Sequence, residues 1–600
     1  MSLFVTIDLS LSKIDSVDDI SNLSKIKMYD KNGNIFYEIT NQHESNYIKI
    51  DEINDYTINA FVAIEDKRFF KHHGFDIYSI SRAFFHNLFH KDKIGGSTIT
   101  QQYVKNIYFS NKKSLIRKIR EIYYAIKIDS IYTKEEILEG YLNTIYFSHG
   151  IYGIKDAAKY YFNKEVKDLT IAESASLVAI IKSPTKYNPE TNYLNNKKRK
   201  ENILKELLKQ NLISKIEYID AVNEEIIITK TNYQTYSPGV LYYKDLVLSQ
   251  IKKMAINSRN IEVYTNFDSD LNKLIDKEIA SSNLTSDISV IVIDHKGNLL
   301  CSYGNKEYSK KQINIGVYGK RMIGSTIKPM LYYEALNNNM DVLTKFMSND
   351  SPMYIGNTKY DFKNYGNKYE NDKITMAYAL ATSDNIYAVK THLYIGSDKL
   401  IKFLKSFKIK NIDDYPSLAL GTVNMSLLKL TTIYNTFSRL GEYSDPKIIN
   451  RITTNNKDLY INKEAPAQKL AKNRTFVINE LMTGMFDVNM SNKISVTGSN
   501  IAKDMVSKCS AKSGLTDYDS YMVGFSPLIT IGIWCGYEDN SLLLDSYNKS
   551  YPKILFKTIF NEKMKENKNI WYQKPNDVYK VFTSPTGLNS SYKKNMYFIY

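Results

Sequence analysis

The sequence contains few of the residues that mark several common classes of protein. Its 600 residues include only three cysteines and two tryptophans. The cysteines, Cys301, Cys509 and Cys535, are odd in number and far apart. They therefore provide neither a disulfide framework nor the close spacing of a metal site. We expect all three to be small buried apolar residues, which is the commonest state of a free cysteine.

Long apolar runs are also absent. No stretch of about 18 apolar residues occurs, so we expect no transmembrane helix within this sequence. The segment at residues 1–15 has one short apolar piece and no basic region before it, which is unlike a secretory signal peptide. We also find no internal repeat and no long low-complexity tract.

The charge balance is strongly positive. The formal net charge is +16, from 80 Lys and Arg against 64 Asp and Glu. Such a balance favours an anionic partner, which could be a nucleic acid, a membrane surface or a phosphorylated substrate. It is equally typical of a background composition rich in Lys and Asn. Because no nucleic-acid-binding signature occurs, we expect no nucleic-acid partner. The length is enough for several domains of about 100–200 residues each.

The first chemically suggestive region covers residues 61–121. Two carboxylates, Glu65 and Glu121, bracket a Gly-Ser-Thr-Gln loop and a group of cations, Lys105, Arg117 and Lys118. Two carboxylates flanking a sugar bond can deprotonate an attacking hydroxyl and assist a leaving group. Fixed cations between them suit a leaving group made of phosphate. An acidic pair or a Gly-Gly-Ser-Thr turn alone would instead be typical of an ordinary surface.

Four segments, taken in order, favour the catalytic interpretation over an ordinary surface. They resemble glycosyltransferase family 51, the peptidoglycan glycosyltransferases. The segments are Glu65-Asp66-x-x-Phe69-x-x-His72-x-Gly74, Gly95-Gly96-Ser97-Thr98-Ile99-Thr100-Gln101-Gln102, Arg117-Lys118-x-x-Glu121 and Ile137-Leu138-Glu139-x-Tyr141-Leu142-Asn143. The resemblance implies a lysozyme-like helical fold, with Glu65 as the general base on the acceptor 4-hydroxyl. It implies that Glu121 supports the departing pyrophosphate, directly or through a divalent cation. It also implies that polar side chains line the substrate site: Ser97, Thr98, Gln101, Gln102, Lys105, Arg117 and Lys118.

Proteins of this family carry an N-terminal membrane anchor just before such a region. We therefore expect that the anchor was trimmed or lies upstream, and that the chain acts at the extracytoplasmic face of the cell membrane. Residues 79–93 combine four large apolar side chains with basic ones, which is the composition of a helix in a bilayer interface. The alternative interpretation of residues 79–93 is a helix that packs in the protein core and has a basic end.

A second set of motifs lies in the other half of the chain. They are Gly324-Ser325-Thr326-Ile327-Lys328, Ser383-Asp384-Asn385 and Lys512-Ser513-Gly514. Each alone is weak, since Ser-x-x-Lys is frequent in a Lys-rich chain. Together, in this order, they are similar to the serine acyl-transferase set of penicillin-binding proteins and class A β-lactamases. The context before Ser325 and after Gly514 also resembles the transpeptidase domain.

The chemistry of this set follows from its residue types. Ser325 and Lys328 are three positions apart, so at a helix N-terminus they share one face. Serine needs an adjacent base to become a nucleophile, and Lys328 can serve only if burial and the charge of Lys512 lower its pKa. Ser383 can relay a proton and Asn385 can hold the substrate amide. The backbone N–H groups of Ser325 and Leu515 could form an oxyanion hole, and Ser513 could bind a substrate carboxylate.

The sequence departs from the family pattern most clearly at Leu515. The usual Lys-Thr-Gly-Thr strand reads Lys-Ser-Gly-Leu-Thr here. Serine at 513 keeps a hydroxyl, whereas Leu515 removes one and Thr516 falls on the opposite face of the strand. We therefore expect Lys512, Ser513, Gly514 and Leu515 to form a transpeptidase site that acylates slowly.

The complete interpretation is a multidomain, class A-like penicillin-binding protein. An all-α lysozyme-like glycosyltransferase domain precedes an α+β serine acyl-transferase domain. We assign 1–50 to an N-terminal segment with a hairpin, 51–205 to the glycosyltransferase, 206–260 to linker helices, 261–565 to the transpeptidase and 566–600 to a C-terminal tail. The expected partners are the lipid-linked peptidoglycan precursor, stem peptides, β-lactams and the membrane surface, with no required cofactor.

Two alternatives remain at the level of sequence. One is a glycosyltransferase whose second domain has a weak or inactive transpeptidase. The other is a non-enzymatic scaffold that senses β-lactams or binds the wall. Intact catalytic residue types in both sites argue against the scaffold.

Overall fold

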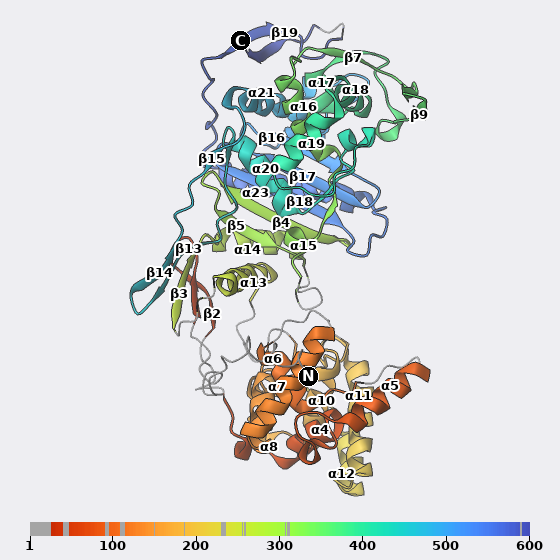
Figure 1. Cartoon of the computed structure of the whole chain (residues 1–600), viewed down its shortest axis with the longest axis vertical. Helices are drawn as coiled ribbons and strands as arrows, with labels where there is room; N and C mark the ends of the chain where they lie inside the picture. The colour runs from red at the N-terminus through yellow and green to blue at the C-terminus, as the bar shows by residue number, and fades with distance from the viewer. Residues whose placement is uncertain are drawn as a thin grey trace, which may run out of the picture. The chain divides into compact units, whose positions relative to one another are not determined.

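The computed structural model of the chain describes residues 26–39, 47–89, 95–108, 115–148, 151–184, 186–229, 236–254, 256, 260–306, 308, 313–588 and 591–599. The chain forms two compact units. Of the described residues, unit 1 contains Ile26 and residues 39–236, and unit 2 contains residues 27–38 and 237–599. The residues predicted as a separate linker, 206–260, are divided between these two units. Figure 1 shows the elements of both units.

Unit 1 is helical, as the absence of strand-like alternation predicts. Its described elements are η1 (Ile50–Glu52), α4 (Asp55–Glu65), η2 (Phe69–Lys71), α5 (Ile77–Phe89), α6 (Ile99–Tyr108), α7 (Leu115–Ile131), α8 (Lys134–Thr144), α9 (Ile154–Phe162), η3 (Val166–Asp168), α10 (Ile171–Lys182), α11 (Tyr193–Lys209) and α12 (Lys215–Asn223). Thr133, Thr170 and Ser214 each complete a reciprocal capping box with a glutamate three positions on. These side chains satisfy the free backbone N–H groups at the starts of α8, α10 and α12.

The core of unit 1 forms where the apolar faces of these helices meet. Ile137, Leu138, Tyr141 and Leu142 of α8 are buried, as are most residues of α10. Phe61 of α4 packs edge-on against Tyr141, with 6.4 Å between the ring centroids. Burial of helix α4 in this core fixes the direction of its C-terminal end, where Glu65 is the last residue.

Unit 2 is built on a five-stranded antiparallel sheet of order β16-β17-β18-β4-β5. The strands are β16 (Ser510–Leu515), β17 (Asp519–Phe525), β18 (Ile529–Gly536), β4 (Asp287–Asp294) and β5 (Leu299–Tyr303). Helix α20 (Leu427–Ser438) packs on one face and α23 (Ser546–Met564) on the other. A Cβ added at Gly532 would lie 2.0 Å from Thr431 of α20, and one added at Gly524 would lie 2.6 Å from Phe556 of α23. Glycine therefore permits the close approach of each helix to the sheet.

A second five-stranded sheet of order β14-β13-β3-β1-β2 belongs mainly to unit 2. Its strands are β14 (Lys457–Ile461), β13 (Ile449–Thr454), β3 (Ile261–Thr265), β1 (Ile26–Tyr29) and β2 (Ile35–Ile39). The hairpin predicted in the N-terminal segment is confirmed as β1 and β2, with Gly33 in the turn between them. The hairpin packs against a strand that is distant in sequence. Tyr29 of β1 stacks on Tyr264 of β3, with 4.8 Å between the ring centroids.

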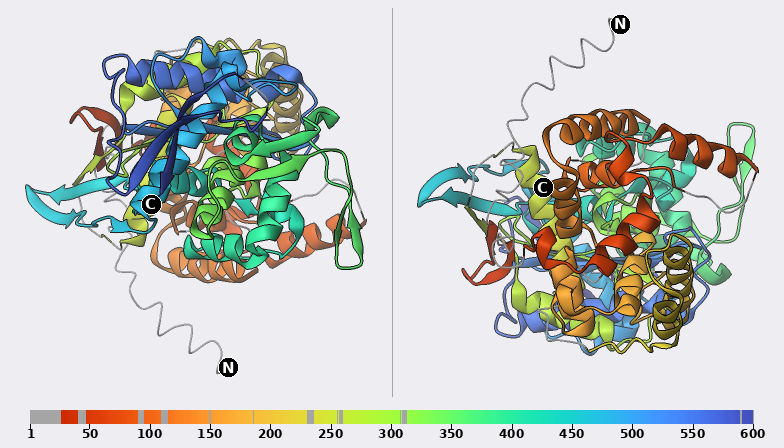
Figure 2. Two further views of the ribbon diagram at one scale, coloured as in Figure 1. Left: turned by 90° about the horizontal axis from the view of Figure 1, so that it is seen from above. Right: turned by 90° about the horizontal axis from the view of Figure 1, so that it is seen from below.

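The other described elements of unit 2 surround the central sheet, as Figures 1 and 2 show. The helices are α13 (Pro238–Lys253), α14 (Ser269–Ala280), α15 (Ile315–Tyr318), η4 (Gly324–Ile327), α16 (Lys328–Asn337), η5 (Tyr365–Asn367), α17 (Met376–Thr382), α18 (Asn385–Ile395), α19 (Ser397–Ser406), η6 (Pro416–Leu420), α21 (Lys472–Met482), η7 (Thr483–Phe486), η8 (Val488–Met490) and α22 (Ser499–Ala502). The strand pairs are β6 (Arg321–Met322) with β11 (Asn424–Met425), β7 (Lys345–Ser348) with β10 (Asp372–Thr375), β8 (Met353–Ile355) with β9 (Thr358–Tyr360), β12 (Glu442–Tyr443) with β15 (Ala467–Gln468), and β19 (Val578–Thr583) with β20 (Lys594–Ile599).

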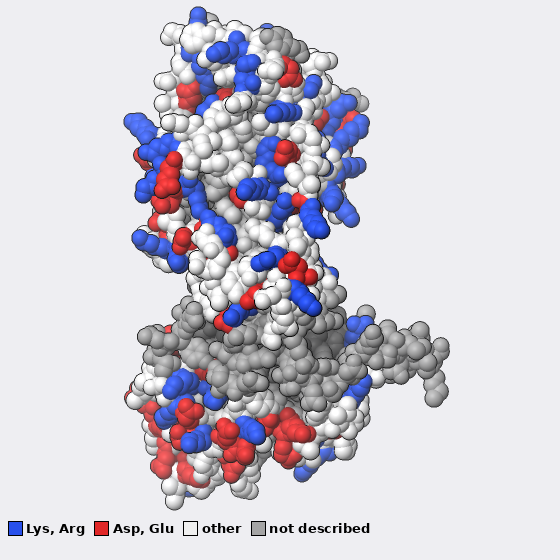
Figure 3. Space-filling view, turned by 90° about the vertical axis from the view of Figure 1, so that its left-hand side faces the viewer, with Lys and Arg blue, Asp and Glu red and all other residues white. Residues whose placement is uncertain are grey.

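Three further features bear on the sequence predictions. The cysteines Cys301, Cys509 and Cys535 are all free and buried, as predicted. On the face drawn in Figure 3, Lys and Arg side chains are dispersed among Asp and Glu and do not form one continuous basic patch. Within the described residues, no helix is both long and apolar enough to cross a bilayer.

Candidate active sites

The first candidate site lies where α4 ends and α6 begins. Glu65 is the last residue of α4, and its Oε2 accepts a hydrogen bond of 2.9 Å from Nε2 of Gln102 on α6. Burial raises the pKa of Glu65, while the Gln102 hydrogen bond and the charges of Arg199 and Lys182 oppose that rise. A carboxyl group with a raised pKa is suited to accept a proton near neutral pH. The geometry therefore fits the predicted general base.

Asp66 connects the first two sequence motifs and was not among the predicted site residues. Its Oδ2 accepts a hydrogen bond of 3.0 Å from the backbone N–H of Ile99, at the start of α6. The same oxygen lies 2.8 Å from Nε2 of His72. Asp66 and His72 are both buried. They hold the start of α6 against the end of α4, which positions Gln102 beside Glu65.

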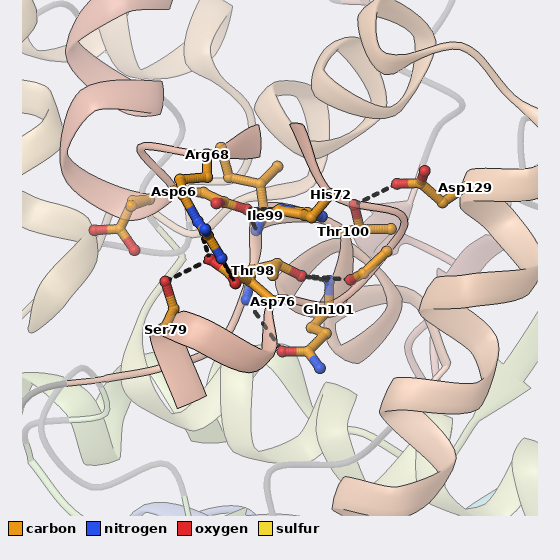
Figure 4. A network of polar contacts seen from close by, with 12 residues as sticks. Asp66, Arg68, His72, Asp76, Ser79, Thr98, Ile99, Thr100, Gln101 and Asp129 are labelled. Atoms are coloured by element: carbon orange, nitrogen blue, oxygen red, sulfur yellow. Dashed lines mark hydrogen bonds and ion pairs between the residues drawn. The ribbon is translucent and has the colours of Figure 1, made fainter. Parts of the chain in front are cut away.

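Two residues predicted to line the substrate site instead support the loop. Thr98 and Gln101 are each 1% exposed. The Thr98 hydroxyl donates 2.7 Å to Gly74 O and accepts 3.1 Å from Gln101 N, and Gln101 Oε1 accepts 3.1 Å from Thr98 N. Figure 4 shows these contacts beside Asp66 and His72. These bonds place the Thr98 hydroxyl and Gln101 Oε1 within the loop before α6, whereas Gln101 Nε2 is buried with no hydrogen-bond partner among the described residues.

The predicted cation and carboxylate pair is present on α7. Lys118 Nζ donates 2.6 Å to Ser97 Oγ and 3.1 Å to Glu121 Oε2. The Glu121 side chain is buried and Lys118 is half-exposed. This arrangement leaves an ammonium group at the edge of the site, where it can meet an anion. Lys105 lies on α6, and the side chain of Arg117 lies outside the described residues.

A further cation, Arg199 on α11, affects the pKa of Glu65. The sequence analysis did not identify it. Its charge lowers the pKa of Glu65, and Glu65 in turn raises the pKa of Arg199 against the lowering effect of burial. Its guanidinium lies 5.2 Å from the ring centroid of Tyr187. No sequence signal marked it, because it is one of many basic residues in a Lys-rich helix 134 positions after Glu65.

The second candidate site is formed by η4, α16, the 382–385 turn and strand β16. Ser325 lies in the short η4 helix, and Lys328 begins α16. Tyr434 of α20 holds this segment by donating a 2.7 Å hydrogen bond to Thr326 O. A Cβ added at Gly514 would lie 2.8 Å from Ile323 O, so glycine is needed where β16 passes the serine segment. Ser325 and Lys328 are therefore fixed from two sides.

The two predicted lysines meet at the Ser383 hydroxyl. Lys328 Nζ lies 3.3 Å from Ser383 Oγ, 2.7 Å from Ser383 O and 2.8 Å from Asn385 Oδ1. Lys512 Nζ donates 2.9 Å to Ser383 Oγ and 2.7 Å to Ser513 O. Ser383 Oγ thus lies between the two lysine amino groups, which suits the predicted role of a proton relay. Four of the predicted catalytic residues are brought together here.

Burial governs the charges of the two lysines. Burial lowers the pKa of Lys328 to about 7, although the Asp384 carboxylate opposes the shift. The pKa of Lys512 is lowered well below its usual range, by burial first and then by the charges of Lys328 and Lys553. The repulsion between the two lysines that the sequence analysis expected is present, and here it lowers the pKa of Lys512. A neutral Lys328 is available near neutral pH and can act as a base.

Backbone geometry supports the proposed oxyanion hole. Thr516 N donates 2.9 Å to Asp519 O, so the adjacent pair Leu515 and Ser520 is a non-hydrogen-bonded pair of the antiparallel ladder. The Leu515 N–H therefore points away from β17. It lies on the outer side of β16, which is the edge strand of this sheet. A Cβ added at Gly324 would lie 3.5 Å from Leu515 N, which places this N–H beside the Ser325 segment. The Thr516 hydroxyl is used within the β16–β17 turn, where Asp519 N donates 2.9 Å to it.

The fold and the two sites define a two-domain enzyme, in which a helical glycosyltransferase precedes a serine acyl-transferase. Comparison with known proteins agrees with that class. A transglycosylase family model matches residues 32–208, and a penicillin binding protein transpeptidase domain model matches residues 288–524. The chain is similar to Penicillin-binding protein 2D of Bacillus subtilis, with 36% identity over 98% of this chain and 87% of that protein. It is 30% identical to Penicillin-binding protein 1A of Aquifex aeolicus, over 85% of this chain and 82% of that protein.

The fold also resembles a solved structure, Penicillin-Binding Protein 1A from Haemophilus influenzae. The TM-score is 0.56 at 17% identity, over 96% of this chain and 98% of that one. The chain belongs to the class A penicillin-binding proteins, the bifunctional enzymes of peptidoglycan synthesis. It has both the glycosyltransferase and the transpeptidase domain of that family.

Proposed function

We propose that unit 1 polymerises a lipid-linked disaccharide-pentapeptide with Glu65 as the general base. The raised pKa of Glu65, with Gln102 as its hydrogen-bond partner, is the observation that carries this assignment. Glu65 would take the proton of the acceptor 4-hydroxyl while the sugar–phosphate bond breaks. Lys118, held between Ser97 and Glu121, would neutralise the departing pyrophosphate, together with Lys105 and Arg117.

The family resemblance allows a divalent cation beside Glu121 but does not require one. Within the described residues, no three His, Cys, Asp or Glu side chains are placed to hold a metal ion. Glu121 Oε2 is already paired with Lys118. We therefore assign no step to a metal. Magnesium bound by one or two carboxylates plus substrate phosphates would need no preformed cage.

In unit 2, we propose that Ser325 attacks the carbonyl of a D-Ala-D-Ala stem peptide. The carbonyl–amine bond breaks, the acyl group stays on Ser325 Oγ, and the leaving amine takes the proton that the serine loses. Neutral Lys328 would receive that proton and Ser383 would pass it to the leaving group. The Leu515 N–H would bind the oxyanion, and Lys512 with Ser513 would hold the substrate carboxylate. A second stem peptide would then accept the acyl group.

The lowered pKa and the contacts of Lys328 favour an active transpeptidase over the non-enzymatic scaffold. A wall-binding scaffold would not require a buried lysine whose pKa is about 7, held at 2.8 Å from Asn385. β-Lactams would acylate the same serine, because they present the same carbonyl and carboxylate. We also propose the membrane surface as a partner and the extracytoplasmic face of the cell membrane as the location, where the lipid-linked precursor is available.

The test uses the wild-type chain in two assays. Incubated with the lipid-linked precursor, it is expected to form glycan polymer. Incubated with a β-lactam and digested, it is expected to give one covalent adduct, on the peptide that contains Ser325. No polymer would contradict the glycosyltransferase proposal. An adduct on another residue, or none, would contradict the transpeptidase proposal.

A further inference from the structure

The turn that carries Ser383 has a backbone conformation that needs support. Ser383 connects α17 to α18 with φ 63° and ψ 41°, in the left-handed region. A residue with a Cβ rarely adopts this region unless its surroundings hold it there. The same residue supplies two of the three acceptors of Lys328 Nζ, its carbonyl oxygen and its hydroxyl. The position of this turn therefore decides where the proton relay lies.

Asn364 holds this turn from outside the three sequence motifs. Its Oδ1 accepts 2.7 Å from Asn385 N, and its Nδ2 donates 2.7 Å to Asp384 Oδ2. The same Nδ2 donates 3.0 Å to Lys368 O. Asn364 is 7% exposed. Both polar atoms of its side chain are therefore committed to the residues on either side of the Asp384–Asn385 peptide bond.

The neighbouring backbone fixes the orientation of the Asn385 side chain. Asn385 Nδ2 donates 2.7 Å to Lys363 O, while Asn385 Oδ1 accepts 2.8 Å from Lys328 Nζ. A flipped amide would place its NH₂ group against the Lys328 amine and its oxygen against a carbonyl oxygen. The segment at residues 363–364 therefore sets which atom of Asn385 faces the lysine.

The segment that carries Asn364 is itself anchored. Glu370, which is 1% exposed, accepts 2.9 Å from Asn492 Nδ2 and 2.9 Å from Ile494 N. Tyr378 of α17 also donates to Glu370 Oε1. Asp384 accepts from Tyr387 N at 2.7 Å, which caps α18. Asn364 therefore joins two fixed elements, the anchored segment and the start of α18.

We propose that Asn364 is a positioning residue of the transpeptidase. It holds the 383–385 turn so that Ser383 Oγ lies between Lys328 and Lys512, and so that Asn385 Oδ1 faces Lys328. Asn364 touches none of the reacting atoms, and it lies 19 positions before Ser383, outside every motif of the sequence. The proposal rests on the proposed acyl-transfer function of unit 2.

The experiment measures β-lactam acylation of the full chain under single turnover, which separates noncovalent affinity from the acylation rate constant. Asn364→Ala is expected to lower the acylation rate constant about 10- to 100-fold, since small misplacements of catalytic groups cost about that much. Glycan polymerisation is expected to stay within about twofold of wild type, because unit 1 is unchanged. The acylation rate constant is expected to fall more than the noncovalent affinity, because the carboxylate-binding residues of β16 are also unchanged.

A matched control removes a buried amide of unit 2 that does not touch the 383–385 turn. Asn435 is 3% exposed, and its Nδ2 donates 2.9 Å to Asp294 O and 3.1 Å to Thr530 Oγ1. Asn435→Ala is expected to reduce thermal stability and leave the acylation rate constant of folded protein unchanged. If Asn364→Ala acylates at the rate of Asn435→Ala, Asn364 has only a structural role and the proposal is wrong.

A second variant keeps the shape of the side chain and adds a readout that loss of stability would not produce. Asn364→Asp retains the acceptor for Asn385 N but puts a carboxylate against Asp384 Oδ2. The two carboxylates repel when both are ionised and can share a proton when one is not. The ratio of variant to wild-type acylation rates is therefore expected to fall as pH rises from about 5 to 8.

Should Asn364→Ala fail to fold, this pH dependence carries the test alone. A ratio that is flat across that range would overturn the proposal. Failure of the underlying function has a different signature, because the wild-type chain itself would then form no adduct on Ser325.

Discussion

Lys328 Nζ donates a hydrogen bond of 2.8 Å to Asn385 Oδ1, across 57 positions of sequence. This contact places the predicted base against the predicted amide-binding residue. It also leaves the lysine fully buried, with a pKa lowered to about 7. The transpeptidase chemistry depends on that combination, because an ordinary lysine, with a pKa of about 10.4, is almost entirely protonated at neutral pH.

The first prediction concerns the pH dependence of acylation. The pKa of Lys328 is lowered by folding, so its neutral form prevails above about pH 7 and is lost as pH falls below that value. The β-lactam acylation rate constant is expected to be level above about pH 7.5 and to fall about tenfold per pH unit below about 6.5. Stopped-flow acylation between pH 5 and 10 measures this, with circular dichroism checking that the chain stays folded. A rate that still rises steeply between pH 8 and 10 would mean that Lys328 keeps an ordinary pKa.

The second prediction concerns Gln102 and the glycosyltransferase. The hydrogen bond from Gln102 lowers the pKa of Glu65, so its removal raises that pKa further. Because the base must be ionised, the acid limb of the polymerisation pH profile in Gln102→Ala is expected to move to higher pH. Gln210→Ala is the matched control, since Gln210 bonds to Ala63 O and Glu206 and not to Glu65. An acid limb at the wild-type pH in Gln102→Ala would argue against Glu65 as the base.

The third prediction concerns Leu515. If the usual Thr hydroxyl contacts the substrate carboxylate, its loss removes a hydrogen bond worth about 1.5–3 kcal/mol. Leu515→Thr is therefore expected to speed β-lactam acylation by several-fold up to about 100-fold, with no change in glycan synthesis. Thr516 cannot supply the missing group, because the Thr516 hydroxyl is bonded within its own turn.

Leu515→Val is the control for this change, since valine has the shape of threonine without its hydroxyl. If the missing hydroxyl slows acylation, Leu515→Thr speeds acylation and Leu515→Val does not. Equal rates in the two variants would assign the effect to side-chain volume. A rate in Leu515→Thr that is unchanged or lower would show that the site has adapted to leucine.

The fourth prediction concerns helix α5, Ile77–Phe89. Phe85 is 60% exposed and Phe89 is 75% exposed, which is unlike the core-helix alternative. Exposed aromatic residues beside basic ones suit a bilayer interface. The chain is expected to bind anionic vesicles, and Phe85→Glu with Phe89→Glu is expected to weaken that binding in a sedimentation assay.

The control for this double variant lies on α12 of the same unit. Ile216 and Ile219 are 73% and 47% exposed, so Ile216→Glu with Ile219→Glu adds the same charge at another apolar site. Vesicle binding that weakens equally in both double variants would reflect charge alone. Unchanged binding by a folded Phe85 and Phe89 double variant would remove α5 from the interface.

Much of the fold and many residues of both sites could be predicted, because short local sequence patterns indicate them. Helices α8, α10 and α12 each begin at a capping box whose residues are three positions apart in the sequence, at Thr133, Thr170 and Ser214. Ser325, Lys328 and Lys512 belong to three short motifs whose residue types and order already indicate a serine acyl-transferase. The hairpin of β1 and β2 was predicted as a hairpin, but its place in a sheet beside β3 was not. Strand pairing over more than 200 positions leaves no local signal.

The supporting residues were harder to predict for a physical reason. Arg199 and Asn364 act through a single charge or amide. Arg199 is one basic residue among many in its helix, and asparagine is abundant in this chain. Their roles depend on which distant backbone groups they meet after folding. Thr98 and Gln101 show the reverse case, since they are in a family motif but their burial commits them to the loop.

The central claim is that one chain carries two chemically independent active sites, with Glu65 in one and Ser325 in the other. The most direct measurement assays glycan polymerisation and covalent β-lactam labelling on Glu65→Gln and on Ser325→Ala in parallel. The account predicts that Glu65→Gln makes no polymer and still labels, and that Ser325→Ala makes polymer and does not label. Near-normal polymer from Glu65→Gln, or a covalent adduct on Ser325→Ala, would contradict it.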